Sequence, residues 1–260
     1  MSISRRRVRA IFRKELREYR HNGNIVYAMA IVPLIIIIQP AIVVFAVPER
    51  AATYLAQGHL LLYLLGIPSI VPALVAAYAV VGEREQGTLE PVLTTPVRRE
   101  EFLLAKALAA FIPSVTIAYG AYGAFLACVE LFAHPAVASA LLQTPEILAQ
   151  VLFTPLITAW SIWVSIAISA RSNDVRVAQQ LSVLASLPTF AVMALIAYDV
   201  IPATLGLALG FGAALLVLDV LGWRLSSAIF NRERLITGTR EKTRGWRPGF
   251  AVRILRSRGA

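Results

Sequence analysis

The chain has 260 residues, of which 58% are hydrophobic and only 15% charged, and it carries a formal net charge of +10. Soluble domains contain about a quarter charged residues, so this composition, with a mean hydropathy of +0.69, indicates a membrane protein. The basic residues flank apolar segments rather than forming one basic domain. This distribution argues against nucleic acid as a partner.

Six apolar runs are long enough to cross a bilayer, which takes about 20 residues per helix. They are residues 25–47, 57–81, 107–131, 151–170, 177–198 and 202–222. The alternating ten-residue strands of a membrane barrel are absent. We therefore predict an all-α polytopic membrane protein with six transmembrane helices, in which Asp199 and Val200 join the last two as a tight hairpin.

The positions of Lys and Arg predict the topology, because cytoplasmic loops carry the excess of positive charge. With the N-terminus inside, the inside segments hold 24 of the 25 basic residues, and the outside loops hold only Arg50. We predict a multi-pass protein of the plasma membrane, with cytoplasmic N- and C-termini. The first span should be retained as an anchor, because no small-residue cleavage site follows it.

The N-terminal segment 1–24 reads as a basic amphipathic helix that lies in the lipid headgroup layer. Asn22 and Gly23 should end this helix before the first span. The alternative is an ordinary charged flank that only sets topology. The predicted apolar face consists of Val8, Ile11, Phe12, Leu16 and Tyr19.

The rest of the chain divides into a six-helix transmembrane domain, 25–222, and a basic cytoplasmic tail, 223–260. The tail should continue the last helix to about residue 236, and its end either contacts anionic lipid or is disordered. Loop 132–150 has room for a short helix at the outer leaflet. In the last span, Gly206 and Gly210 form a GxxxG that favours close helix packing, more often within one chain than between two.

The sequence contains few residue patterns that indicate nucleotide binding, metal binding or catalysis. No phosphate-binding loop of the GxxxxGK[ST] type is present, and His21, His59 and His134 are too far apart to suggest a metal site. We expect no catalytic residue, no metal and no cofactor on this chain. An ion-coupled secondary transporter is one alternative, with Asp219 as its candidate ion site. We expect Asp219 either to pair with a base such as Arg224 or to meet interfacial water. An intramembrane enzyme is the other.

One polar segment, residues 82–106, separates the second and third apolar runs. Its first charges bring the second span out into water, and Gly87 permits a sharp turn. Leu89, Val92 and Leu93 fall on one face of a short helix. Thr95-Pro96 is a suitable start for the next helix. The segment reads either as a docking site for a cytoplasmic partner or as a surface hairpin that packs on the bundle.

The sequence of this segment resembles the signature of ABC-2 type permeases, the membrane subunits of ATP-binding-cassette exporters. The similarity lies in EREQGTLE (83–90), LTTPV (93–97) and EFLLAK (101–106), together with the basic N-terminal helix, six spans and two cytoplasmic ends. The segment departs from the family pattern at Ala105, where glycine is usual, and at Arg98, where a small capping residue is common. These departures concern local helix geometry.

The resemblance implies a transmembrane permease subunit that forms the translocation pathway and exports a substrate such as an amphiphile, a lipid or a drug. It also implies two partners: a separate ABC ATPase subunit, which binds ATP and Mg²⁺, and a second copy of the chain or a homologous permease. The segment 83–106 would be the coupling segment that contacts the ATPase. The contact residues would be Glu83, Arg84, Glu85, Gly87, Thr88, Leu89, Glu90, Leu93 and Pro96.

Overall fold

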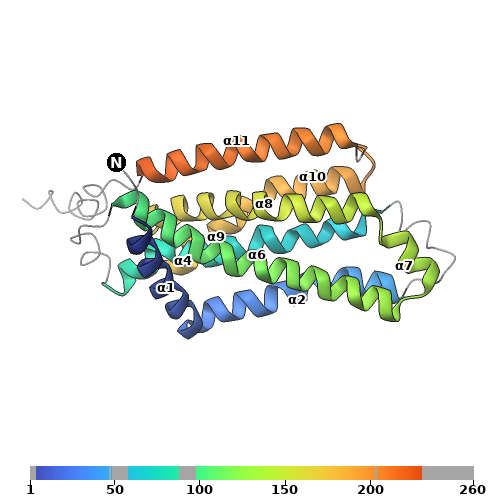
Figure 1. The fold of residues 1–260 in the computed structure, drawn as a ribbon, viewed down its shortest axis with the longest axis horizontal. Coiled ribbons are helices and arrows are strands. Elements are labelled where there is room, and N and C mark those ends of the chain that lie inside the picture. The colour runs from blue at the N-terminus through green and yellow to red at the C-terminus, as the bar shows by residue number, and fades with distance from the viewer. Residues whose placement is uncertain (1–3, 47, 49–57, 88–97, 203, 230–260) are drawn as a thin grey trace, which may run out of the picture.

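The computed structural model describes residues 4–46, 48, 58–87, 98–202 and 204–229, and their regular structure is helical (Figure 1). In chain order the elements are α1 (Arg5–His21), α2 (Gly23–Ala46), η2 (Leu60–Leu65), α4 (Gly66–Glu85), α6 (Arg99–Phe132), α7 (Pro135–Leu141), α8 (Thr144–Arg171), α9 (Val175–Ser182), η3 (Val183–Ser186), α10 (Leu187–Ala197) and α11 (Leu205–Ile229). Predictions that concern residues 88–97 or the tail beyond Ile229 lie outside these residues.

Six helical segments of the described chain are long and apolar enough to cross a membrane, which confirms the predicted number. They are Gly23–Ala46, Leu60–Glu85, Glu100–Phe132, Thr144–Arg171, Val175–Ala197 and Leu205–Ala228. They run lengthwise beside one another in a single bundle (Figure 1). The short helix expected in loop 132–150 is α7.

The fifth of these segments is not one regular helix, because the 3₁₀ turn η3 separates α9 from α10. Pro188 is the second residue of α10. A proline has no N–H, and its ring clashes with the carbonyl four residues earlier, which here belongs to Leu184 within η3. The tighter 3₁₀ turn relieves that clash locally.

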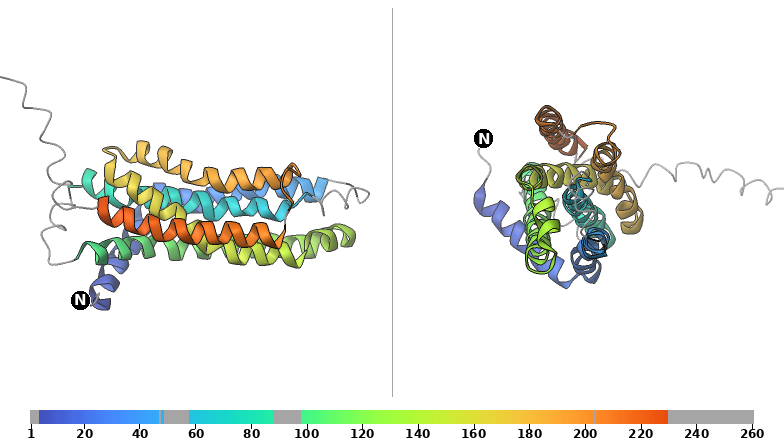
Figure 2. Two further views of the ribbon diagram at one scale, coloured as in Figure 1. Left: turned by 90° about the horizontal axis from the view of Figure 1, so that it is seen from above. Right: turned by 90° about the vertical axis from the view of Figure 1, so that its right-hand side faces the viewer.

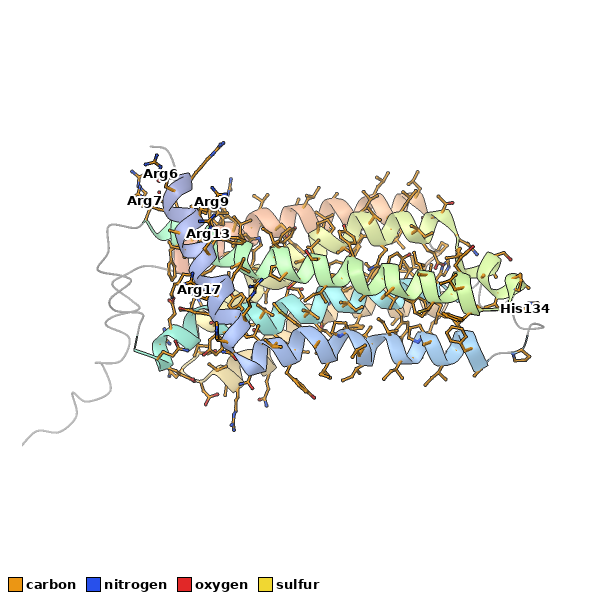
Figure 3. The ribbon with its side chains drawn as sticks, turned by 60° about the horizontal axis from the view of Figure 1, so that its bottom comes forward. Arg6, Arg7, Arg9, Arg13, Arg17 and His134 are labelled. Carbon is orange, nitrogen blue, oxygen red and sulfur yellow. The ribbon has the colours of Figure 1, made fainter. Side chains whose placement is uncertain are left out.

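Most of the basic segments gather at one end of the bundle, which we call the basic end (Figures 1 and 2). It comprises α1, the end of α4, the start of α6, the link between α8 and α9, and the end of α11. Helix α7 lies at the opposite end. Figure 3 shows the same separation, with the arginines of α1 at one end and His134 at the other. This grouping agrees with a topology in which these segments share one side of the membrane.

Helix α4 is the central element, since 78% of its span is buried inside the chain. Its main neighbour is α8, which presents a buried face of small polar residues, namely Thr158, Ser161, Ser165 and Ser169. The Ser169 hydroxyl accepts hydrogen bonds from the backbone N–H groups of Val80 (3.1 Å) and Val81 (3.0 Å). Small residues let two helices approach closely where no apolar driving force exists between them.

Helix α11 is peripheral, with 6% of its span buried, and it lies along α8 (Figure 2). The contact between the two helices is close at Gly222, where an added Cβ would lie 2.8 Å from Trp163 Cβ. The Trp163 and Trp223 rings meet edge to face, with centroids 5.2 Å apart.

Two expectations for this helix find no support within the described chain. The GxxxG of Gly206 and Gly210 packs against nothing in the described chain: both residues are exposed, and a Cβ at Gly210 would meet no atom within 4 Å. The expected pairing of Asp219 with Arg224 is absent from the described ion pairs, and the buried Asp219 Oδ1 has no hydrogen-bond partner. The face of α11 that carries Gly206 and Gly210 is therefore exposed in the described chain.

Candidate functional site at the end of α4

Three consecutive charged residues end helix α4, and each contacts a different part of the bundle. Glu83 is the first and is 4% exposed. One of its carboxylate oxygens lies 3.0 Å from Lys14 Nζ of α1 and 3.1 Å from Lys106 Nζ of α6. Glu83 therefore joins α4 to both of these helices.

Arg84 reaches the end of α8. Its guanidinium donates to the carbonyl oxygens of Ser172 (2.6 Å) and Ala170 (3.1 Å). The last carbonyls of a helix have no partner within the helix, and a cation is favourable at this negative end of the helix dipole. Arg84 thus completes the C-terminal turn of α8.

Glu85 reaches the start of α9. Its carboxylate accepts from the Val175 N–H at 2.9 Å. The neighbouring Asp174 accepts from the N–H groups of Arg176 (2.7 Å) and Val177 (3.1 Å). These two carboxylates satisfy donors that the first turn of α9 leaves unpaired, and their charge suits the positive end of the helix.

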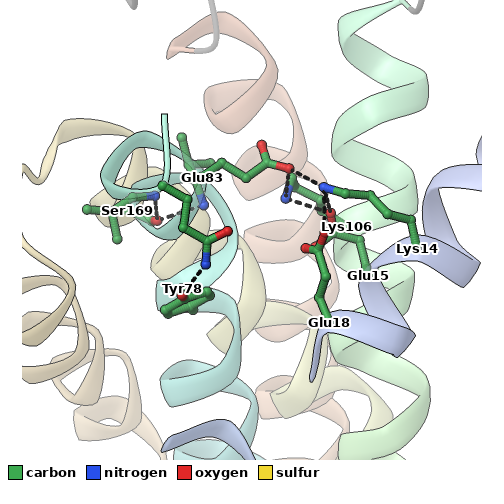
Figure 4. A network of polar contacts seen from close by, with 10 residues as sticks. Lys14, Glu15, Glu18, Tyr78, Glu83, Lys106 and Ser169 are labelled. Atoms are coloured by element: carbon green, nitrogen blue, oxygen red, sulfur yellow. Dashed lines mark hydrogen bonds and ion pairs between the residues drawn. The ribbon is translucent and has the colours of Figure 1, made fainter. Parts of the chain in front are cut away.

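The contacts of Glu83 belong to a larger ion cluster that holds α1 on the bundle (Figure 4). Lys106 Nζ lies 2.9 Å from Glu15 Oε1, and Lys14 Nζ lies 3.0 Å from Glu18 Oε1. Burial alone would lower the pKa of Lys14, but the carboxylates of Glu83, Glu15 and Glu18 raise it above its usual value. Lys14 is thus held in its charged form.

A second polar junction joins the start of α1 to the start of α6. Glu101 is fully buried and accepts from the backbone N–H of Ser4 at 2.8 Å. Its carboxylate also pairs with Arg7 at 3.1 Å and accepts from the Arg98 N–H at 3.2 Å. Arg98 is extended and precedes the first helical residue, Arg99. Thr95 is therefore not the N-cap of this helix, and the predicted start was wrong by three residues.

The predicted contact residues fall into two groups. Glu83, Arg84 and Glu85 make the internal contacts above, and Gly87 adopts the positive φ of 68° that favours glycine. The remainder, Thr88, Leu89, Glu90, Leu93 and Pro96, lie outside the described residues. The polar segment is consequently anchored to the bundle through its first three charges, which sequence reasoning had assigned to an external partner.

The predicted apolar face of α1 is directed largely at protein. Ile11, Phe12 and Tyr19 pack against the buried cluster formed by α4, α6 and α8. Val8 and Leu16 are half-buried. Contact of this helix with lipid stays a prediction. The sequence does hold a signal for the docking that was missed, because Glu15 falls among the apolar positions of the helix, where an acid needs a buried partner.

Within the described part of the chain, no group of three or more His, Cys, Asp or Glu residues is placed to hold a metal ion. The arrangement at the end of α4 holds helices together through charge pairs and helix caps.

The fold and this site define the class: a polytopic helical membrane protein whose polar link between the second and third spans is anchored at one end of the bundle. A family model described as ABC-2 family transporter protein matches residues 9–221, which is most of the chain. The protein belongs to the ABC-2 transporter family. No curated protein matches the chain.

Proposed function

We propose that the protein is the permease subunit of an ABC-2 exporter and that a separate ATPase subunit drives it through residues 83–97. The observation that carries the proposal is the threefold anchoring at the end of α4. Membership of a transporter family whose permeases generally work with an ATPase subunit also supports it. The sequence has no phosphate-binding loop of its own.

In this proposal, residues 88–97 receive the push and the end of α4 distributes it. Leu89 and Leu93 are the apolar contacts with the ATPase, and Thr88, Glu90 and Pro96 complete that contact. Because Glu83, Arg84 and Glu85 bind three different parts of the bundle, a displacement of the link moves these parts together. Such a rigid-body movement is one of the ways in which packed helices pass between two arrangements.

The remaining assignments follow the charge distribution and the exposed surface. Both termini and the basic end face the cytoplasm, and the membrane is the plasma membrane. A second copy of the chain packs against the exposed small face of α11, because Gly206 and Gly210 are exposed and a Cβ at Gly210 would meet no atom of the described chain within 4 Å. The cargo is an amphiphile of lipid or drug type, since the spans hold few charged groups at mid-depth.

The test is to purify the chain from its native membrane, to identify an ATP-binding-cassette protein in the complex and to measure phosphate release from ATP. We expect Leu89→Gln with Leu93→Gln to separate the ATPase from the permease and to abolish transport. The matched control is Leu131→Gln, which changes an exposed leucine at the opposite end of the bundle. It should leave the complex intact.

Two outcomes would overturn the proposal. Transport driven by an imposed proton or sodium gradient without ATP, and lost in Asp219→Asn, would identify an ion-coupled transporter instead. Turnover of a substrate by the purified chain alone would identify an enzyme.

A further inference from the structure

A cavity of about 400 Å³ lies at the basic end, beside the junction of α1 and α2. It is lined by residues of α1, by the end of α4 and by Lys106 of α6. The first transmembrane helix begins here, at Gly23. The volume falls within the range of small-molecule sites, about 300–1,000 Å³. None of the functions assigned above uses this cavity.

Acidic groups outnumber basic ones in the cavity wall. Glu15, Glu18 and Glu83 line it, and Lys106 is the one lysine or arginine among its described lining residues. Lys14 lies just outside and pairs with Glu18 and Glu83. Three carboxylates thus face two ammonium groups. Figure 3 labels five arginines of α1, of which Arg7 pairs with Glu101, and none of the five is among the described lining residues.

The wall also contains a buried hydroxyl that lacks a partner. Tyr19 is 4% exposed and lines the cavity, and its Oη makes no hydrogen bond within the described chain. A buried polar atom normally has a partner, so an unpaired one needs an explanation. Burial, together with the charges of Glu15, Glu83 and Glu18, raises the pKa of Tyr19 well above its usual value. The surroundings of this hydroxyl are therefore electronegative.

The other polar groups of the wall indicate which chemical groups a ligand of the cavity would need. The Gln86 amide donates to the Tyr78 hydroxyl at 2.8 Å, so these two groups satisfy each other. Lys106 Nζ is engaged by Glu15 and Glu83. His21 Nδ1 lies 2.8 Å from the Arg17 carbonyl oxygen, and the Asn22 side-chain oxygen accepts from the Asn24 and Ile25 N–H groups. The anionic acceptors of the wall are the carboxylate oxygens, and the Tyr19 oxygen lies beside them. A ligand that fits this wall brings positive charge and several N–H donors.

We propose that this cavity binds a primary ammonium group, which donates to the Tyr19 hydroxyl and to the carboxylates of Glu15 and Glu18. Two sources present this group: the headgroup of an ethanolamine phospholipid and a free primary amine. A primary ammonium has three N–H donors and no acceptor, which matches the wall. Bonds to a charged group are the stronger kind.

The experiment uses the full-length chain in nanodiscs of phosphatidylglycerol. Native mass spectrometry measures the binding of added phosphatidylethanolamine and phosphatidylcholine, and calorimetry measures the binding of free ethanolamine. We expect phosphatidylethanolamine to bind in preference to phosphatidylcholine, whose headgroup has no N–H. Binding of free ethanolamine, in competition with the lipid, identifies the free amine as a ligand; its absence identifies the lipid headgroup.

Two variants connect this binding to the cavity. Tyr19→Phe removes one oxygen atom, and Glu18→Gln removes one charge from a half-exposed side chain, so neither empties the core. Each should weaken ammonium binding about 10- to 100-fold, the range for one lost hydrogen bond to a charged group. Tyr27→Phe and Glu130→Gln, at exposed positions on α2 and α6, are the matched controls and should change nothing. Equal binding of the two added lipids, or unchanged affinity in both cavity variants with an unaltered melting temperature, would overturn the proposal.

Discussion

Lys106 Nζ lies 2.9 Å from Glu15 Oε1, and the two side chains are 1% and 2% exposed. The pair joins α6 to α1 across 91 positions of the sequence. Because Glu83 of α4 contacts the same lysine, three helices converge on a single ammonium group (Figure 4). A buried charge of this kind depends on its partners, since removal from water is costly unless the charge is paired.

Lys106→Met should destabilise the docking of α1 by about 3–5 kcal/mol, because it leaves Glu15 and Glu83 buried with only Lys14 nearby. The measurement is hydrogen exchange of the α1 amides in detergent or nanodiscs. We expect faster exchange in α1, while the centre of α4 remains protected.

The double variant Lys106→Met with Glu15→Gln provides the control. It removes one of the stranded charges, so it should recover part of the lost protection. Equal exchange in the single and double variants would mean that the ion pair does not hold α1.

Ser169→Ala should destabilise the contact between α4 and α8 by about 1–3 kcal/mol. The hydroxyl accepts from two N–H groups in the interior of α4, so the variant loses two hydrogen bonds that join the helices. Thermal unfolding followed by tryptophan fluorescence is the measurement. Ser139→Ala, at an exposed position on α7, is the matched control and should be neutral.

Gly210→Leu should leave the fold of one chain unchanged and weaken its pairing with a second copy. An added Cβ at Gly210 has open space around it within the chain, whereas a large side chain at a close interface between helices costs about 1–3 kcal/mol. Cross-linking in membranes over a range of protein-to-lipid ratios measures the pairing. Gly120→Leu on α6, which also has open space, is the control. Unaltered cross-linking of Gly210→Leu would show that α11 is not the interface.

Alkaline titration should reveal the buried phenol of Tyr19. Burial and the nearby carboxylates of Glu15, Glu83 and Glu18 raise its pKa in the folded protein, while the unfolded value is about 10. The associated stability is therefore fully present below about pH 10 and is lost as the pH rises further. The difference in tyrosinate absorbance between the wild type and Tyr19→Phe should stay flat through pH 10. A normal titration in that difference would contradict the assigned environment.

The membrane-spanning part of the fold could be predicted from the sequence because it depends on the length of each apolar run. A span requires about 20 apolar residues, and each of the six runs overlaps a helical segment whose ends differ from the expected bounds by at most seven residues. The break in the fifth span could not be predicted from the sequence alone. Pro188 is evident in the sequence, but a proline near the middle of an apolar run can kink, end or begin a helix. The 3₁₀ turn before it depends on the packing of α9 against α4 and α8.

The site was predicted less well, and for a physical reason. The motif Glu83-Arg84-Glu85 was recognised, yet local sequence does not tell whether a charge faces water or a partner 69 to 90 positions away. Only the position of Glu15 on the apolar face of α1 pointed to such a partner. The exposed GxxxG of α11 illustrates the same limit, since small residues favour close packing but do not indicate which helix packs against them.

The central position of α4 also has a consequence for the order of synthesis. Its bonds with α8 join residues 88–90 positions apart. A ribosome that adds about 5–20 residues per second needs roughly 4 to 18 s to make the intervening chain. Throughout that interval the end of α4 has α1 and then α6 as neighbours, while its serine-rich neighbour does not yet exist. The first half of the bundle must therefore wait in the membrane in an unfinished state, shielded by insertion machinery or lipid until the fourth span arrives.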